Sequence, residues 1–463
     1  MNTVDLQISP ERLGLVRGVA NPPGTLEECN RLLEYNHEAH HVFFRERAGM
    51  NHVTHSLLTC FALGIGVEEL RKRYDDEAVN QRAMPPLDAD LLGRLDDPEV
   101  FLESMFNKAQ YNTFLHFFRN KIAAGGGGGG GGWKKVVHEY VFSRTDVAER
   151  MLSSLFDGLY HPLIHLGLAI EFELPGLVAE ALAQTATNDD CNLHGLFGKC
   201  EEEAAKAQNN QGPPPSMLQL LTTARETEEL RTAPRWEDRF QMLRNGVVDS
   251  RGSAAFARLA GRFRVRPDED EIEFRTAEMV SVVAYMCGAA QRAGRPPKID
   301  FFWMHSVTSS VFLTVIGRQR DWISPENRAR LLTRKVYTDL GWYVVAGSAP
   351  LDREHLAGYS SPESDGMSWE DVFAAVTKEH DDGHAAKFIR AVKNGEQVCK
   401  QYEGTKLGES LPVTGDMWLK LARMCQDTTK NMTRDVKWVR FTGHDEAWEG
   451  PDAAWMRPDL LTK

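Results

Sequence analysis

The segment HDDGHAAKFIRA, residues 380–391, carries the residue types from which a metal site could be built. If it is helical, His380, His384 and Lys387 stand at positions i, i+4 and i+7 and project from one face. Imidazole is the commonest metal ligand among side chains, whereas a lysine ammonium has three donors and no lone pair. The segment therefore predicts two imidazoles and an amine on one patch, and it raises the question of what the amine does there.

Histidines also mark three apolar segments that lie far from this one in the sequence. They are NHVTHSLLTCFALG with His52 and His55, YHPLIHLGLAIEF with His161 and His165, and DFFWMHSVTSS with His305. A buried neutral imidazole needs a partner for each ring nitrogen. A shared metal ion would satisfy one nitrogen of each ring, and a carbonyl or carboxylate the other. The candidate carboxylates are Asp381, Asp382, Glu171 and Glu173.

Each of these histidines, taken alone, is more simply a core or capping residue, so the inference of a metal site depends on the four segments together. A further cluster, YNHEAHHVFF with His37, His40 and His41, lies among acid and amide side chains and is interpreted as a solvated or capping stretch. The sequence has no GxSxG or phosphate-loop motif and no convincing dinucleotide fingerprint. Hydrolase and stable nucleotide-binding functions therefore lack support from motifs.

Most of the chain has apolar residues at three- and four-residue spacing, which is the helical period. Only residues 342–347 and 435–443 alternate or run as strands do. We therefore expect a mainly α fold, with residues 1–463 forming a single helical domain and little or no β structure. Flexible loops are expected at the glycine run 125–132 and at the proline-rich stretch near 209–216.

Composition limits the classes of partner. The net charge is −12 with no basic block, so a nucleic-acid partner is not expected. The seven cysteines are scattered without a CxxC pair, which is typical of a reduced compartment and argues against a thiolate zinc site. No apolar run approaches the ~18 residues that a membrane helix needs. We expect a cytoplasmic protein without a membrane partner, and the sequence sets no oligomeric state.

Four segments, NHVTHSLLTCFALG, YHPLIHLGLAIEF, FFWMHSVTSS and DDGHAAKFIRA, together resemble the questin oxidase-like proteins of fungal aromatic polyketide pathways. The resemblance spans roughly residues 20–440. It implies an oxygenase that uses O2 to open the central ring of an anthraquinone such as questin. Members of this family have been described as Baeyer–Villiger oxidases that use a reduced nicotinamide cofactor, so NADPH is a candidate reductant.

The resemblance also implies a non-haem Fe(II) centre held by four histidines and a carboxylated lysine. This answers the question of the amine, because a neutral buried lysine can add carbon dioxide and become an anionic carbamate. Such a set leaves one octahedral position open for oxygen. Residue by residue, the resemblance implies these metal ligands: His55, His165, His305, His384 and Lys387.

Two of these choices are preferences between neighbours. His165 is preferred to His161, and His55 to His52, because a residue inside the first helical turns points inward more dependably than one at the helix start. His52 and His161 stay open as alternatives. A substrate pocket lined by aromatic residues is expected, and the segment FFWM at 301–304 is either part of it or ordinary core.

Three other functions stay open. The first is an NADPH-dependent Baeyer–Villiger oxidase without bound iron, whose activity would survive a strong chelator. The second is a non-catalytic helical protein that binds aromatic metabolites without consuming oxygen. The third, weaker, is a zinc hydrolase, because a lysine carbamate serves zinc as well as iron.

Overall fold

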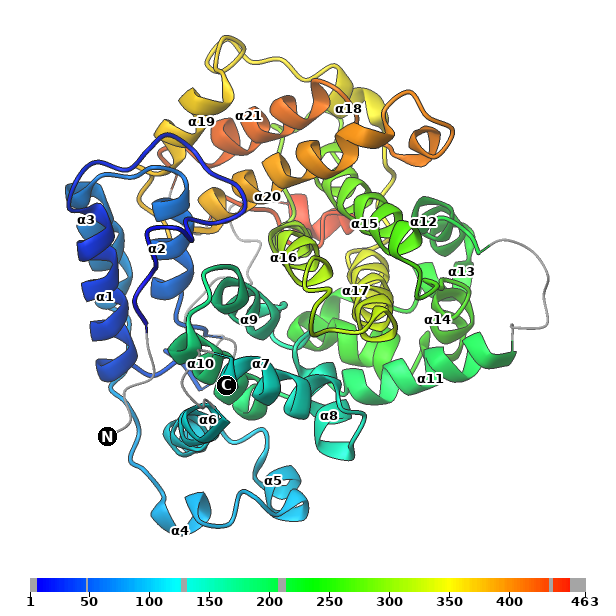
Figure 1. Cartoon of the computed structure of the whole chain (residues 1–463). Coiled ribbons are helices and arrows are strands. Elements are labelled where there is room, and N and C mark those ends of the chain that lie inside the picture. The colour runs from blue at the N-terminus through cyan, green and yellow to red at the C-terminus, as the bar shows by residue number, and fades with distance from the viewer. Residues whose placement is uncertain (1–5, 47–48, 126–130, 207–213, 433–435, 450–463) are drawn as a thin grey trace. The chain divides into compact units, whose positions relative to one another are not determined.

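The computed structural model describes residues 6–46, 49–125, 131–206, 214–432 and 436–449. Helices make up nearly all of the regular structure in these residues (Figure 1). Their only β pairing is three isolated bridges, His40 with Ala83, Phe43 with Met50, and Asp300 with Val439. The prediction of a mainly α fold is confirmed.

Both predicted strands are wrong within the described residues. Residues 342–345 form the last turn of helix α17 (Pro325–Val345), and the chain leaves this helix near Gly347, which has a φ of +82°. A short buried apolar run suits a helix as well as a strand, and here the long helix before it decides. In the segment 435–443, residue 435 lies outside the described part, and the remainder pairs only through the bridge of Val439.

The predicted loops fall largely on residues outside the described part. Of the glycine run, Gly125 ends helix α6 (Tyr111–Gly125) and Gly132 begins helix α7 (Gly132–Val137). Residues 126–130 lie outside the described ranges, as do residues 207–213 of the proline-rich stretch. The end of that stretch leads into helix α12 (Met217–Glu226), where Ser216 and Gln219 form a reciprocal capping box.

The packing of the chain divides it into two compact units. Unit 1 comprises residues 1–190, 312–327 and 377–387, and unit 2 comprises residues 191–311, 328–376 and 388–463. Helix α20 (His384–Cys399) begins in unit 1 and continues into unit 2. That residues 1–463 act as one domain stays a prediction.

Unit 1 is built around helices that are apolar on nearly every side. Its other helices are α1 (Thr25–Ala39), α2 (Val53–Ala62), α3 (Val67–Ala78), α4 (Ala89–Leu92), α5 (Pro98–Ser104), α8 (Asp146–Ser154), α9 (His161–Glu171) and α10 (Pro175–Thr187). Helix α9 packs against α2 and α10, and α10 packs against α6. Every residue of α2 is buried, as expected of a helix without a polar face. A methyl group on Gly167 of α9 would overlap the ring of Phe312, so the helix depends on glycine there.

Unit 2 holds the remaining helices, except that residues 312–317, at the end of one of them, belong to unit 1. They are α11 (Leu193–Lys206), α13 (Glu228–Arg231), α14 (Ser253–Ala260), α15 (Glu269–Ala289), α16 (Phe301–Gly317), α18 (Arg353–Ala357), α19 (Trp369–Val376) and α21 (Met417–Thr429). The aromatic residues at the start of α16 are core: Phe302 stacks on Trp342 and Phe441, and Trp303 is fully buried beside Tyr343. A substrate-lining role for these residues stays a prediction.

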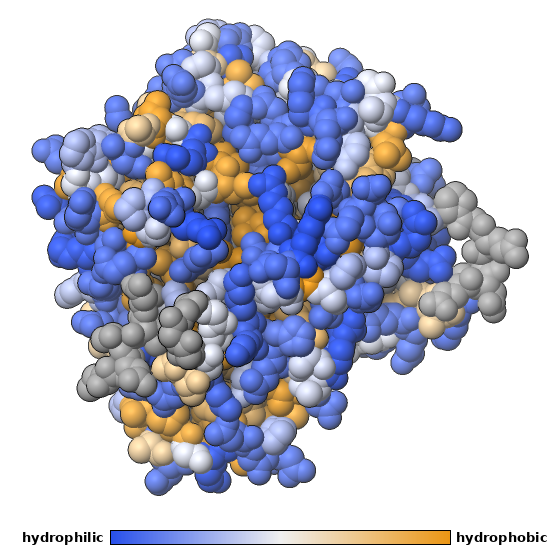
Figure 2. Space-filling view, in the orientation of Figure 1, coloured by the Kyte–Doolittle hydropathy of each residue, from blue (hydrophilic) through white to orange (hydrophobic). Residues whose placement is uncertain are grey.

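Short 3-10 and π turns complete the helical structure. They are η1 (Lys108–Gln110), η2 (His138–Phe142), η4 (Trp236–Gln241), η5 (Arg244–Val248), η6 (Lys400–Tyr402), η7 (Gly408–Ser410) and η8 (Asp445–Trp448). Among the described helices, none combines the length and the apolar character that crossing a membrane requires. The face seen in Figure 2 is largely hydrophilic, with hydrophobic residues set mostly between polar ones.

Candidate metal centre

Three buried imidazoles of unit 1 meet at one point. Ring nitrogens of His52, His161 and His384 all lie within 4.8 Å of one another. Nε2 of His52 is 2.8 Å from Nε2 of His161, and the ring centroid of His52 is 4.7 Å from that of His384. Three converging imidazole nitrogens in a buried site are a donor set that suits a transition-metal ion.

Each of the three histidines stands at the start of a helix. His52 is the N-cap of α2, and His161 and His384 are the first residues of α9 and α20. The positive ends of three helix dipoles therefore point toward the site. These dipoles disfavour protonated imidazoles there and favour a ligand that carries negative charge.

Residues with left-handed backbone precede two of these helix starts. Gly158, Leu159 and Tyr160, which precede α9, all have positive φ values of 58°, 58° and 62°. Gly383, which precedes α20, has a φ of +76°, and a Cβ there would lie 2.9 Å from Cβ of Ser56 on α2. This conformation costs Leu159 and Tyr160 free energy, so it persists where the surrounding structure requires it, often at functional sites, whereas Gly158 and Gly383 adopt it without strain.

Hydrogen bonds orient the rings so that a nitrogen of each can bind a metal. Nδ1 of His161 donates to the carbonyl of Gly158 at 2.6 Å, and Nδ1 of His384 contacts the carboxylate of Asp382. With the proton on Nδ1, the lone pair of each ring is on Nε2. Nδ1 of His52 is buried and has no hydrogen-bond partner. A metal ion would satisfy this nitrogen. The side chains present here therefore suit a bound metal.

A second pair of histidines continues the site through a buried carboxylate. Nε2 of His55 is 3.0 Å from Nδ1 of His165, and Nε2 of His165 is 2.9 Å from Oε2 of Glu180. The other oxygen of Glu180 contacts Nδ1 of His37. A carboxylate only accepts, so a neutral His165 donates from Nε2 and accepts the Nε2 proton of His55. This arrangement leaves the lone pair of His55 on Nδ1, which is buried and has no partner.

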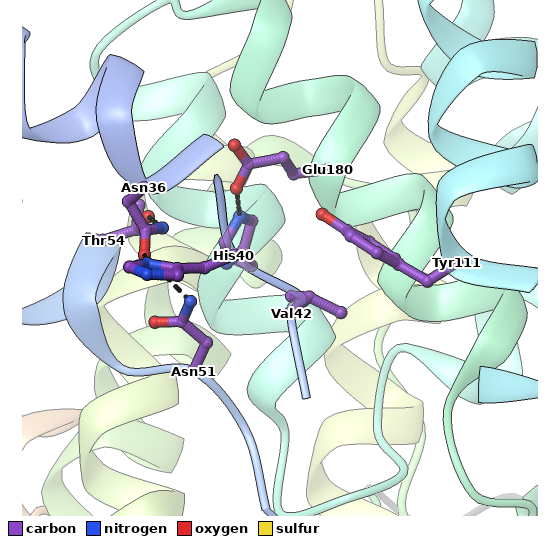
Figure 3. Close-up of a pocket in the computed structure, with 8 residues that line it drawn as sticks. Asn36, His40, Val42, Asn51, Thr54, Tyr111 and Glu180 are labelled. Atoms are coloured by element: carbon purple, nitrogen blue, oxygen red, sulfur yellow. Dashed lines mark hydrogen bonds and ion pairs between the residues drawn. The ribbon is translucent and has the colours of Figure 1, made fainter. Parts of the chain in front are cut away.

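The carboxylate of Glu180 faces a narrow cavity (Figure 3). Its walls include Asn36, His40, Asn51 and Tyr111, and the hydroxyl end of Tyr111 points toward Glu180. The cavity has no room for a water-sized sphere. The carboxylate of Glu180 is instead held by the two imidazoles that contact it, those of His37 and His165.

Burial keeps the imidazoles of the site neutral. Burial and the nearby charge of Lys387 lower the pKa of His161 to about 3 and that of His52 well below its usual value. Burial, followed by the neighbouring His165, does the same to the pKa of His55. Burial by itself raises the pKa of Glu180, but the contacts with His37 and His165 outweigh it and lower the pKa to about 2. Neutral imidazoles are the form that binds metal.

Lys387 lies in the first turn of α20, and its side chain is 5% exposed. A buried cation at the positive end of a helix is unfavourable on both counts. Its amine acts on all four imidazoles around it, because its charge contributes to the lowered pKa values of His52, His55, His161 and His384. A residue that is unfavourable both in its burial and in its place on the helix is typical of a functional site.

The structure thus brings His384 and Lys387 together with His52 and His161, the two alternatives that the sequence left open. His55 adjoins this group, and His165 binds the opposite side of His55. His305 belongs to unit 2, where its Nδ1 donates to the carbonyl of Phe301 at 2.7 Å. The predicted ligand set stays a prediction, and the geometry within unit 1 supports His52 and His161 better than His165.

Two interpretations of histidines are wrong. His380 does not share the face of His384, because helix α20 begins only at His384; its side chain is 80% exposed and pairs with Asp76. His37 and His41 are buried rather than solvated: His37 contacts Glu180, and His41 bonds the carbonyl of Lys108. The interpretation was misled by the polar residues next to them in the sequence. Helix α1 is amphipathic, and His37 lies on its buried side.

Glu180 is the residue beside the candidate site that the sequence reasoning missed. The carboxylates considered were Asp381, Asp382, Glu171 and Glu173. Of these, Asp382 contacts His384, whereas Glu171 bonds the backbone N–H of Leu15 and Glu173 pairs with Arg12. A signal for Glu180 was present, because it is the only charged residue of PGLVAEALAQTAT, the sequence of α10. A single carboxylate in an apolar helix has to be paired inside the protein.

Comparisons with known proteins agree with these features. Residues 50–392 match the model of the questin oxidase-like family. The chain is 50% identical over 449 residues to a Baeyer–Villiger monooxygenase of Cryptosporiopsis sp., covering 97% of this chain and 99% of that protein. It is 50% identical over 450 residues to a Baeyer–Villiger oxidase of Paecilomyces divaricatus, covering 97% and 96%. It is 42% identical over 442 residues to a questin oxidase of Aspergillus terreus, covering 95% and 96%. The chain therefore belongs to the questin oxidase-like family, whose relatives named here are oxygenase-type oxidoreductases.

Proposed function

We propose that this oxidoreductase is an iron-dependent oxygenase that opens the central ring of an anthraquinone in fungal polyketide biosynthesis. The substrate class follows from the relatives that are named questin oxidases, and the names of the other relatives indicate insertion of oxygen beside a carbonyl. The observation that carries the iron proposal is the convergence of His52, His161 and His384 within 4.8 Å.

The proposed ligands are four imidazoles and one anion. His52, His161 and His384 converge directly, and His55 offers a buried Nδ1 without another partner. In this assignment His165 does not bind iron, because its Nε2 donates to Glu180, its Nδ1 lies 3.0 Å from His55, and its ring is not among the three that converge. His305, also predicted as a ligand, would replace one of these histidines. Single substitutions with measurement of bound metal decide between these assignments.

Lys387 is the proposed anionic ligand, as its carbamate. The ammonium first loses a proton, and the neutral amine then adds carbon dioxide through a new N–C bond and releases a second proton, so a cation is exchanged for a carboxylate. That exchange removes a buried cation from the start of α20 and supplies the negative charge that three helix N-termini favour. Ferrous iron held there would supply the single-electron chemistry that reaction with O2 requires.

The protein residues supply the other requirements of the reaction. Gly158 and Asp382 orient the rings of His161 and His384 by accepting from Nδ1. The surrounding helices exclude water, since all residues of α2 and all but the last residue of α9 are buried. Exclusion of water strengthens the hydrogen bonds that position these groups and limits side reactions.

Metal content and oxygen uptake test the proposal together. Protein purified without added metal should contain about one iron per chain, and its oxygen uptake with an anthraquinone should stop after chelation and return with Fe(II) alone. Turnover that needs only NADPH and survives chelation would instead establish a Baeyer–Villiger oxidase without bound iron. Binding of the anthraquinone without oxygen uptake would indicate a binding protein.

Lys387→Ala tests the carbamate. Loss of the anionic ligand should abolish bound iron and turnover while the far-ultraviolet circular dichroism spectrum stays unchanged, and added acetate should restore part of the iron by supplying a carboxylate in the vacated space. Lys393→Ala is the matched control on the same helix, because Lys393 is partly exposed and contacts Glu396 and the ring of Trp369. Normal iron content in Lys387→Ala would overturn the assignment.

A further inference from the structure

A cavity of about 480 Å³ lies in unit 2, and none of its lining residues belongs to the candidate metal centre. Three arginines line it, Arg225, Arg231 and Arg292, together with Gln291 and His444. Its volume is that of a pocket for a small molecule or a nucleotide. Three guanidinium groups around one cavity are unexpected in a chain with a net charge of −12.

Two of these arginines carry charge that no described carboxylate neutralises. The guanidinium of Arg225 donates to the carbonyl of Ser348 at 2.6 Å, and that of Arg231 donates to the carbonyl of Arg225 at 3.1 Å. Arginines close by in the sequence behave differently, since Arg251 pairs with Asp238 and Arg258 with Glu229. A guanidinium has five N–H donors, so each of the two retains donors for a ligand.

The third arginine is held by residues near the C-terminal end of the described chain. Arg292 donates to the carbonyl of His444 and pairs with Asp445, whose side chain is 76% exposed. With one exposed carboxylate beside three guanidinium groups, the cavity keeps a net positive charge. Backbone carbonyls fix the positions of the guanidinium groups, which reduces the entropy lost when an anion binds.

One wall of the cavity is preformed by close backbone packing. The N–H of Gly443 bonds the carbonyl of Ala346 at 2.8 Å, and a Cβ on Gly347 would lie 2.9 Å from the carbonyl carbon of Gly443. Nε2 of His444 donates to the carbonyl of Val345 at 3.1 Å. The close packing of Gly347 against Gly443 fixes the position of this wall.

We propose that this cavity is a binding site for a phosphate-bearing small molecule of about nucleotide size. Guanidinium groups bind phosphate oxygens through paired, charge-assisted hydrogen bonds, and three of them suit a ligand with two or more negative charges. An apolar anthraquinone would leave these groups unsatisfied. A nucleic-acid strand would need a basic track along the surface, which the acidic composition does not provide. The site is independent of the metal centre proposed above.

Calorimetric titration of the full chain in phosphate-free buffer at low ionic strength tests this proposal, with inorganic pyrophosphate, ADP and NADPH as probes. At least one probe should bind saturably, and the double variant Arg225→Met and Arg231→Met should weaken that binding by at least about tenfold, because it removes two charge-assisted contacts. Methionine keeps the length and apolar stem of each side chain. Arg295→Met is the matched control, since Arg295 is exposed and does not line the cavity.

The three probes identify the ligand class. Equal affinity for pyrophosphate and ADP would mean that phosphate alone is recognised, whereas tighter binding of ADP or NADPH would mean that the nucleoside contributes. Iron content should be unchanged in the double variant, which separates this site from the proposed oxygenase centre. The proposal is overturned if no probe binds, or if the double variant binds as tightly as Arg295→Met does.

Discussion

At the scale of single residues, the candidate centre depends on which nitrogen of each imidazole carries the proton. The acceptors that decide this are Gly158 for His161, Asp382 for His384 and Glu180 for His165. Each acceptor is itself held by the fold, so the lone pairs are directed before a ligand arrives. A pocket preorganised in this way binds a metal without the cost of reorienting the rings.

Glu180→Gln tests this direction of hydrogen bonds. An amide keeps the shape of the carboxylate but turns an N–H2 toward one of the two imidazoles, so either His37 or His165 loses its acceptor. In the proposed assignment Glu180 acts on the ligand His55 only through His165, so iron affinity should fall by less than the about 10- to 100-fold that is usual when the direct partner of a ligating group is changed. The melting temperature, measured without metal, reports any structural damage separately.

Glu173→Gln is the control for Glu180→Gln, because Glu173 is partly exposed and pairs with Arg12 at the surface. It should bind iron as the unmodified protein does. Equal iron affinity in both variants would mean that Glu180 only fills space between two histidines.

At the scale of elements, the site depends on the close approach of α2 and the start of α20. Gly383 permits this approach, because it has a φ of +76° and lies against Ser56 of α2 without a side chain. Gly383→Ala should lower the free energy of unfolding by about 2–3 kcal/mol and weaken iron binding, since the added methyl group pushes His384 away from His52.

Gly404→Ala is the matched control for Gly383→Ala. Gly404 also has a φ of +76°, but no heavy atom lies within 4 Å of the position of a Cβ there. Backbone strain alone should lower the free energy of unfolding of this variant by about 1 kcal/mol, and the variant should keep its iron. Chemical denaturation and metal analysis of both variants distinguish steric contact from strain.

A buried carboxylate joins the start of α16 to the chain near residue 442. Asp300 accepts from the N–H groups of Phe302, Trp303 and Thr442. Burial raises its pKa from 3.8 to about 6, although these three hydrogen bonds oppose the rise. The folded state thus favours the protonated form, so the contribution of Asp300 to stability is complete below about pH 4 and is lost as the pH rises through 6.

Asp300→Asn isolates this contribution because an amide does not titrate. Between pH 4 and pH 6 to 7, the free energy of unfolding of the unmodified protein should fall relative to that of the variant, by on the order of 2–3 kcal/mol for a shift of about two pH units. Urea denaturation of both proteins at several pH values measures the difference. A difference that does not change with pH would show that Asp300 titrates at the same pH in the folded and unfolded chains.

At the scale of the whole molecule, burial makes the thiols inert. Six of the seven cysteines are buried, and only Cys191 is partly exposed. Burial raises the pKa of Cys60 to about 12, and it also raises the pKa values of Cys29, Cys200, Cys287 and Cys399. The thiolate is the reactive form, so these side chains should not react while the protein is folded.

A thiol reagent in excess should therefore modify one cysteine per folded chain and seven in guanidinium chloride. Cys191→Ser should lower the first number to zero and the second to six. Rapid reaction of two or more thiols under native conditions would mean that one of the units opens readily.

The amino-acid sequence by itself determined the helical class, the family and the segments that carry the site. Apolar spacing is a local property, so the helices α2, α9 and α20 could be recognised without knowledge of their neighbours. The pattern of histidines and one lysine in these segments was sufficient for the resemblance to the questin oxidase-like family, which the comparisons confirm.

Only the tertiary structure decided which members of each histidine pair meet. His52 and His55, like His161 and His165, are separated by about one helical turn, so spacing alone places both members on nearly the same face. The choice depends on where three helices begin, and the left-handed residues before α9 and α20 bring His52, His161 and His384 together. The role of Glu180 is likewise a tertiary property, because its partners His37 and His165 lie 143 and 15 residues away in the sequence.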